Sequence, residues 1–113
     1  MTARIDRKHC PCCGEFLGDA AFYARLDAMC ETLGYVPTVS SGYRCAAHNR
    51  AVSRRSTGRH VTGQAVDVIA KGPRIRGALL DAALKAGLVS FAILPGGAGL
   101  HIDAGTIPWL GIE

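Results

Sequence analysis

Apolar residues recur at helical spacing in two stretches of the chain. The first stretch predicts a helix over residues 20–33, which begins after Asp19 and ends at Gly34. The second predicts a helix that begins at Pro73 and ends near Gly87. Each expected helix has one apolar face: Phe22, Leu26, Met29, Cys30 and Leu33 in the first, and Ile75, Leu79, Leu80, Ala83 and Leu84 in the second.

Short apolar runs predict four strands. They lie at about residues 35–40, 64–70, 89–94 and 99–103, and a short helix over 45–53 fits between the first two. A Pro-Gly-Gly turn joins the last two strands, which can therefore pair as a hairpin. The order of elements predicts an α+β fold in which helices pack on a small antiparallel sheet.

The length of 113 residues predicts a single domain over 1–113, with residues 1–18 as an irregular, Cys-containing lead-in. The composition, 49% apolar and 19% charged, is that of a globular protein. No apolar run approaches the ~20 residues of a membrane span. The polar first residues lack the apolar core of a signal peptide. We expect a monomer that is made in the cytoplasm, and any export must use another route.

The formal net charge of +4 comes from ten Arg and three Lys against nine acidic residues. Such an excess suits an anionic partner such as a cell-wall polymer, although it also serves solubility alone. Arg54, Arg55 and Arg59 form a basic loop before His60. We do not expect nucleic-acid binding, because the chain has no stacking aromatic set and no recognised binding motif.

Five cysteines lie in the first 45 residues: Cys10, Cys12, Cys13, Cys30 and Cys45. Because their number is odd, at least one is free, bound to metal or paired between chains. The segment Cys10-Pro-Cys12-Cys13-Gly14 resembles a metal knuckle. It could hold a second, structural zinc together with Cys30 or Cys45, and with His9 as a further candidate. A disulfide and free, partly buried thiols are the two alternatives that the sequence leaves open.

His60, Asp67 and His101 make up the ligand set of a zinc site with an open fourth position. The seven-residue step from His60 to Asp67 does not fit one helix face, but it fits a loop that turns at Gly63 and enters a strand. A carboxylate among valines needs a partner, and a metal supplies one. His101 and Asp103 are two residues apart, so they face the same side of a strand. Because zinc lowers the pKa of bound water to ~7, the trio predicts a hydrolase.

Three motifs then occur in order along the chain: Ser-Gly-Tyr-Arg-Cys-x-x-His-Asn at 41–49, His-x-x-Gly-x-Ala-x-Asp at 60–67 and His-x-Asp at 101–103. Together they resemble the zinc D-Ala-D-Ala carboxypeptidase family of peptidoglycan peptidases. That family is related to vancomycin-resistance dipeptidases, to phage L-alanyl-D-glutamate endolysins and to the hedgehog domain. The resemblance runs from about residue 35 to 105, and it implies a hedgehog/DD-peptidase-like fold.

The resemblance also implies roles for single residues. The two histidines and Asp67 would bind zinc, and Arg44 would contact the substrate carbonyl or carboxylate and stabilise the oxyanion. We expect His48 to be a hydrogen-bonded structural histidine and Trp109 to pack against the core.

The chain departs from the family pattern in two respects. Gly58 stands where relatives usually have Ser, and Ala98 and Gly99 stand where many carry Glu, Asp or His. Asp103 is the nearest carboxylate in sequence, and we assign it the role of general base. The alternative is that Asp103 orients His101 or another ligand.

The function that the resemblance implies is zinc-dependent hydrolysis of peptidoglycan stem or cross-link peptides by a metal-activated water. The protein would act on the cell wall after release, as a phage lysis or virion protein would. The alternative is a catalytically silent zinc-binding module of the same fold that binds cell wall or a protein partner. The residues do not distinguish which peptide bond is cut.

Overall fold

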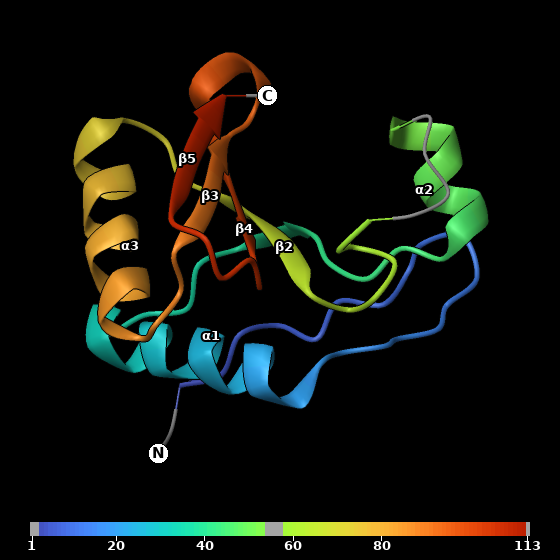
Figure 1. The fold of residues 1–113 in the computed structure, drawn as a ribbon, viewed down its shortest axis with the longest axis horizontal. Helices are drawn as coiled ribbons and strands as arrows, with labels where there is room; N and C mark the ends of the chain where they lie inside the picture. Colours follow the sequence, from blue (N-terminus) through green and yellow to red (C-terminus); the bar gives the residue numbers. More distant parts are fainter. Residues whose placement is uncertain (1–2, 54–57, 113) are drawn as a thin grey trace.

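A computed structural model describes residues 3–53 and 58–112. Within these ranges three α-helices accompany one five-stranded sheet (Figure 1). The elements are α1 (Ala20–Leu33), β1 (Val39–Ser41), α2 (Ala46–Ser53), β2 (Ala65–Ile69), α3 (Pro73–Lys85), β3 (Ser90–Ile93), the 3₁₀ turn η1 (Pro95–Gly97), β4 (Gly99–Asp103) and β5 (Trp109–Ile112). The α+β class predicted from the sequence is confirmed. None of the described helices is long and apolar enough to cross a membrane.

The sheet has the strand order β1-β2-β4-β3-β5. Pairing is antiparallel throughout the first four strands, but β5 runs parallel to β3. The expectation of a wholly antiparallel sheet is therefore wrong at this edge. Strand β5 has no clear signal in the sequence, because its four residues include a glycine and show no clear alternation. Its pairing depends on contacts with a distant strand.

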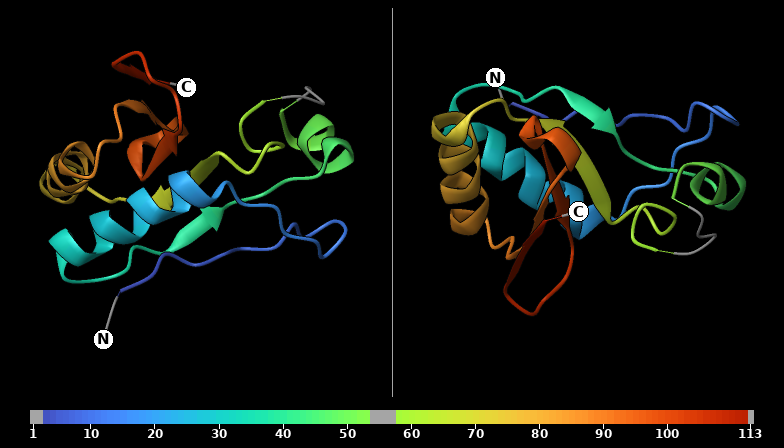
Figure 2. Two further views of the ribbon diagram at one scale, coloured as in Figure 1. Left: turned by 60° about the horizontal axis from the view of Figure 1, so that its bottom comes forward. Right: turned by 90° about the horizontal axis from the view of Figure 1, so that it is seen from above.

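One hydrophobic core lies between the sheet and the helices α1 and α3. Alternate residues of the central strands face it, with Val66 and Val68 from β2 and Leu100 and Ile102 from β4 fully buried. Helix α1 lies alongside the sheet next to α3, while α2 stands apart at the opposite end of the molecule (Figures 1 and 2). The residues between the buried positions of β2 and β4 therefore point to the other face of the sheet.

Helix α1 begins and ends where the sequence predicts. The Asp19 carboxylate accepts a hydrogen bond from the backbone N–H of Phe22 at 2.8 Å, and Gly34 ends the helix in the left-handed conformation. The face predicted for α3 is only partly correct, because Ile75 and Leu84 are 46% and 55% exposed. The buried stripe of α3 is narrower than its apolar stripe, since the core covers only part of this helix.

Trp109 does not pack into the core as the sequence led us to expect. It lies on the edge strand β5, and its side chain is 57% exposed. Its indole lies over Gly111, two residues further along the strand, where an added Cβ would collide with the ring. A small residue two positions along the strand thus lets the indole lie over its own strand.

The described part of the lead-in, residues 3–18, has no helix or strand but is attached to α1. Ile5 is buried in the core, and its backbone N–H donates to the Asp27 carboxylate at 2.9 Å. Arg7 donates two hydrogen bonds to the same carboxylate, at 2.6 and 2.8 Å. Burial opposes the charge of Asp27, but these hydrogen bonds outweigh it and hold the pKa of Asp27 below its ordinary value. The lead-in is therefore part of the packed structure.

Candidate metal centre

Strand pairing places two of the predicted ligands side by side. In the antiparallel register of β2 and β4, Asp67 lies directly opposite His101. Directly opposed residues bring their Cβ atoms to ~4.5–5.5 Å and share one face of the sheet. That face is the one turned away from the core, because the neighbouring valines of β2 take the core side. Asp103 lies two residues beyond His101 and so shares the face as well.

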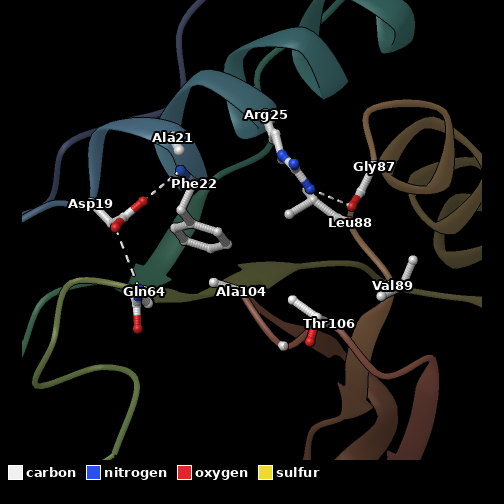
Figure 3. A pocket seen from close by; sticks show the side chains of 11 residues that line it. Asp19, Ala21, Phe22, Arg25, Gln64, Gly87, Leu88, Val89, Ala104 and Thr106 are labelled. Carbon is white, nitrogen blue, oxygen red and sulfur yellow. Dashed lines mark hydrogen bonds between the residues drawn. The ribbon is translucent and has the colours of Figure 1, made fainter.

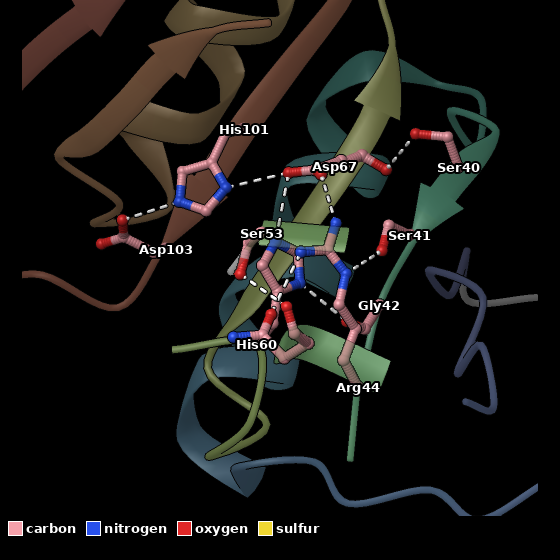
Figure 4. A network of polar contacts seen from close by, with 10 residues as sticks. Ser40, Ser41, Gly42, Arg44, Ser53, His60, Asp67, His101 and Asp103 are labelled. Carbon is pink, nitrogen blue, oxygen red and sulfur yellow. Dashed lines mark hydrogen bonds and ion pairs between the residues drawn. The ribbon is translucent and has the colours of Figure 1, made fainter. Parts of the chain in front are cut away.

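His60 reaches the same place from the loop before β2. The loop turns at Gly63, whose φ is +72°, and an added Cβ there would collide with the Leu17 carbonyl. The Nδ1–H of His60 donates to the Gly42 carbonyl at 2.7 Å. This hydrogen bond turns Nε2 towards Asp67 Oδ1, which lies 3.4 Å away (Figure 4). His60 is buried, so its ring is held on both sides.

His101 lies between two carboxylates. Its Nδ1 is 2.8 Å from Asp67 Oδ1, and its Nε2 is 2.9 Å from Asp103 Oδ2 (Figure 4). One donor atom each from His60, Asp67 and His101 lies within 4.8 Å of the others. The structure therefore brings the three predicted ligands together. The donor set fits zinc, because each imidazole turns one nitrogen to the centre and has an orienting partner on the other.

The electrostatics of the centre favour a bound cation. Asp67 is 7% exposed, and although burial opposes its charge, hydrogen bonds with His101 and His60 bring its pKa well below the ordinary value. Burial also opposes the charge of His101, but hydrogen bonds to Asp103 and Asp67 outweigh it and raise the pKa of His101 to about 9. Without a metal, a proton on His101 balances the carboxylates.

Arg44 lies at the edge of this cluster. Its Nη2 is 3.4 Å from Asp67 Oδ2, its Nε donates to Ser41 Oγ at 2.9 Å, and its Nη1 donates to the Asn49 side-chain oxygen at 3.2 Å. Sequence reasoning assigned no role to Ser41, Asn49 or the carbonyl of Gly42. All three lie in the first motif, at 41–49, so that motif pointed to the segment that contains them.

Both carboxylate oxygens of Asp103 are engaged. Oδ2 contacts His101, and Oδ1 accepts from the backbone N–H of Gly105 at 2.8 Å. Arg59 adds a longer contact, with its Nε 3.6 Å from Oδ1. Burial of Asp103 opposes its charge, but the hydrogen bonds from His101, Gly105 and Ser90 outweigh this and lower its pKa. Asp103 therefore behaves as an ionised acceptor whose lone pairs are largely occupied.

A cavity of about 360 Å³ lies between the start of α1 and the adjoining end of the sheet (Figure 3). None of the three candidate ligands lines it. Gln64 and Gly105 do, and they lie close in sequence to Asp67 and Asp103. Two polar contacts border the cavity: the Asp19 carboxylate accepts from the Gln64 amide at 3.4 Å, and Arg25 donates to the Gly87 carbonyl at 2.8 Å. It is therefore a separate hollow on the segments that carry the metal centre.

Three of the cysteines lie together, Cys30 lies apart from them, and Cys12 is exposed. Sulfur atoms of Cys10, Cys13 and Cys45 lie within 4.8 Å of one another, whereas Cys30 is buried in the hydrophobic core. All five cysteines are free thiols in this structure. His9 is exposed, its ring lies 5.7 Å from that of Phe16 in a tilted arrangement, and it belongs to neither metal-ligating group. His48 is also outside them. The predicted basic residues Arg54 and Arg55 lie outside the described residues.

Comparison with known proteins gave one match. A family model described as Peptidase M15 matches residues 9–103, which include the cysteine turn, Arg44, the three candidate ligands and Asp103. Neither curated proteins nor solved structures gave a significant match to the chain.

Proposed function

The chain belongs to the peptidase M15 family, and from this premise we propose that it is a zinc-dependent peptidase acting on the stem or cross-link peptides of peptidoglycan. The observation that carries the proposal is the convergence of His60, Asp67 and His101 on one point of the sheet, within 4.8 Å of one another. Two imidazoles and one carboxylate leave a fourth position for water and substrate, as a hydrolytic zinc requires.

Hydrogen bonds within the chain orient the two proposed histidine ligands. The Gly42 carbonyl selects the tautomer of His60 that leaves Nε2 free to bind metal. Asp103 accepts from Nε2 of His101 and so directs Nδ1 towards Asp67. A zinc ion bound there would act as a Lewis acid on the scissile carbonyl and lower the pKa of water.

We assign Arg44 to the substrate. Its guanidinium is permanently charged and is fixed by Ser41 and Asn49 at the rim of the ligand cluster. From this position it can donate to the carbonyl or carboxylate oxygen of a peptide and stabilise the negative charge that develops during hydrolysis. Asp67 holds the guanidinium in the substrate-free protein, at 3.4 Å.

For Asp103 the contacts favour the positioning role over the role of general base. Its Oδ2 faces the nitrogen of His101 that points away from Asp67, and its Oδ1 is taken by the Gly105 N–H. A lowered pKa also makes a weak base at neutral pH, whereas efficient bases have a pKa near the working pH. We therefore propose that Asp103 orients His101, and the base role stays a prediction that a single variant can test.

The peptidoglycan substrate is a proposal that follows from the three ordered motifs. The exposed, positively charged Arg59 lies beside Asp103, so an anionic wall polymer would meet a favourable charge at the centre. We propose that the protein is a monomer that acts on the cell wall after its release from the cell.

A silent zinc-binding module is the second candidate function. Its support is specific: both oxygens of Asp103 are hydrogen-bonded, and Ala98 and Gly99 occupy the positions where many relatives carry an acid. Such a module would bind zinc and wall peptides without cutting them.

Metal analysis tests the proposed centre directly. Asp67→Asn should lose one zinc ion relative to the wild type, because an amide cannot supply the anionic ligand. Asp81→Asn is the matched control, since Asp81 lies exposed on α3 and pairs with Lys85. Equal zinc contents in both variants would show that Asp67 is not a ligand.

A further inference from the structure

A second group of metal-ligating side chains lies outside the proposed active centre. The chain reverses between Cys10 and Glu15, where Cys10 N–H donates to the Glu15 carbonyl and Gly14 N–H donates to the Cys10 carbonyl, both at 2.8 Å. This turn presents Cys10 and Cys13 towards Cys45, which directly precedes α2. Residues 35 positions apart thus form one thiol cluster.

The spacing of the sulfur atoms is that of metal ligands. Cys10 Sγ and Cys45 Sγ are 3.7 Å apart. Zn–S bonds of ~2.3 Å in a tetrahedron place two sulfurs ~3.8 Å apart, whereas a disulfide needs ~2.05 Å. The third sulfur, from Cys13, lies within 4.8 Å of both.

Backbone groups around the cluster favour thiolates. The Cys45 N–H donates to the Cys10 sulfur, and the His48 N–H donates to the Cys45 sulfur, each at 3.4 Å. Backbone N–H donors of this kind stabilise the negative charge of a thiolate. Thiolates are the form that binds zinc.

Cys12 is the candidate for a fourth ligand. It lies between Cys10 and Cys13 on the same turn, and its side chain is exposed, so it can close the cluster from the solvent side. A closed tetrahedral site of four protein ligands is the usual form of structural zinc.

We propose that Cys10, Cys13 and Cys45 bind a structural Zn²⁺ ion, with Cys12 as the fourth ligand. The ion would tie the lead-in turn to the segment that carries Arg44, the residue before Cys45. Arg44 N–H also donates to the His60 carbonyl at 3.2 Å, so the same segment touches the loop of a proposed catalytic ligand. The zinc binding stands without the proposed function, and only its effect on Arg44 depends on it.

Metal counting on purified protein is the first test. We expect about two zinc ions per wild-type chain and about one in Cys45→Ser and in Cys10→Ser. Cys30→Ala is the matched control and should keep both ions, because Cys30 lies in the core. An unchanged zinc content in both cluster variants would overturn the proposal. Iron bound at the cysteine cluster in place of zinc would also overturn the proposal.

X-ray absorption on the Asp67→Asn protein isolates the second ion. The remaining zinc should have sulfur neighbours at ~2.3 Å and no histidine nitrogen. Thiol titration of the unfolded, chelated and non-reduced protein should give all five cysteines. Three reactive thiols would instead indicate a disulfide and exclude the site.

Separate measurements test the fourth ligand and the stabilising effect of the cluster zinc. Cys12→Ser should weaken zinc binding at the cluster, whereas loss of that zinc in His48→Ala would overturn the assignment of Cys12. Removal of the cluster zinc in the Asp67→Asn background should lower the unfolding temperature. An unchanged temperature would contradict the proposal that the ion ties the lead-in turn to the segment that carries Arg44. A wild-type protein with a single zinc bound by sulfur would contradict the proposed active centre but not this inference. A wild-type protein with a single zinc bound by nitrogen and oxygen would contradict this inference but not the proposed active centre.

Discussion

Zinc binding at the proposed centre should release a proton from His101. The ring lies between the carboxylates of Asp67 and Asp103, which raise its pKa to about 9. Zinc needs the neutral ring, so a proton must leave Nδ1 when the metal enters. At pH 7, about two units below this pKa, about 1% of the metal-free protein has a neutral His101.

The magnitude follows from that fraction. The apparent zinc affinity at pH 7 should be about 100-fold below its high-pH limit and should rise about tenfold per pH unit between pH 7 and 8.5. The sign is set by the raised pKa, because protons compete with zinc below it and stop competing above it. Asp67, whose pKa is lowered, is ionised throughout this range and adds no dependence.

Competition with a chelator of known pH dependence measures the affinity, and calorimetry in buffers of different ionisation enthalpy counts the protons. The Cys10→Ser/Cys45→Ser protein is the right material, since cluster thiols would release protons of their own. We expect at least one proton released per zinc at pH 7, one from His101 and a further fraction from the zinc-bound water. An affinity that does not change with pH, or zero protons released, would refute the assignment of His101 as a ligand held between two carboxylates.

Three further predictions concern single residues. Arg44→Lys should lower kcat ~10²–10³-fold with a smaller change in KM, because one oriented donor is lost in the transition state; normal turnover would make Arg44 structural. Asp103→Asn should weaken zinc ~10–100-fold, with activity restored by added metal, if Asp103 orients His101. If it is the base, the variant should instead keep its zinc and lose ~10²–10⁴ in rate. Asp27→Asn should lower the free energy of unfolding at pH 7 by about 1–3 kcal/mol, because Arg7 and the Ile5 N–H lose a charged acceptor. This difference should shrink as urea titrations are taken below about pH 4, since the wild-type carboxylate then takes up a proton.

Local signals in the sequence were sufficient for the helices and for choosing three candidate ligands that lie together in the fold. Asp19 and Gly34 bound α1 because capping depends on neighbours within one turn. His101 and Asp103 share a face because side chains alternate along any strand. The ligand assignment needed only the ordered motifs, and the structure places the three side chains together.

Contacts between distant segments were not predictable in the same way. The register that sets Asp67 opposite His101 depends on how β2 pairs with β4, and the Gly42 carbonyl that orients His60 has no side-chain signature. The parallel edge strand β5 and the exposure of Trp109 likewise follow from packing against β3. The sequence also left open whether Cys30 or Cys45 lies next to the cysteine turn. In the fold it is Cys45, the residue directly before α2.

Digestion of purified peptidoglycan, with the released fragments identified by mass, tests the central claim most directly. The zinc-loaded wild type should release peptide fragments, a strong chelator should stop the release, and Asp67→Asn should release none while Asp81→Asn remains active. The fragment masses would also identify the bond that is cut. A zinc-loaded wild type that releases nothing from any peptidoglycan chemotype, or an Asp67→Asn variant that digests it normally, would contradict the account.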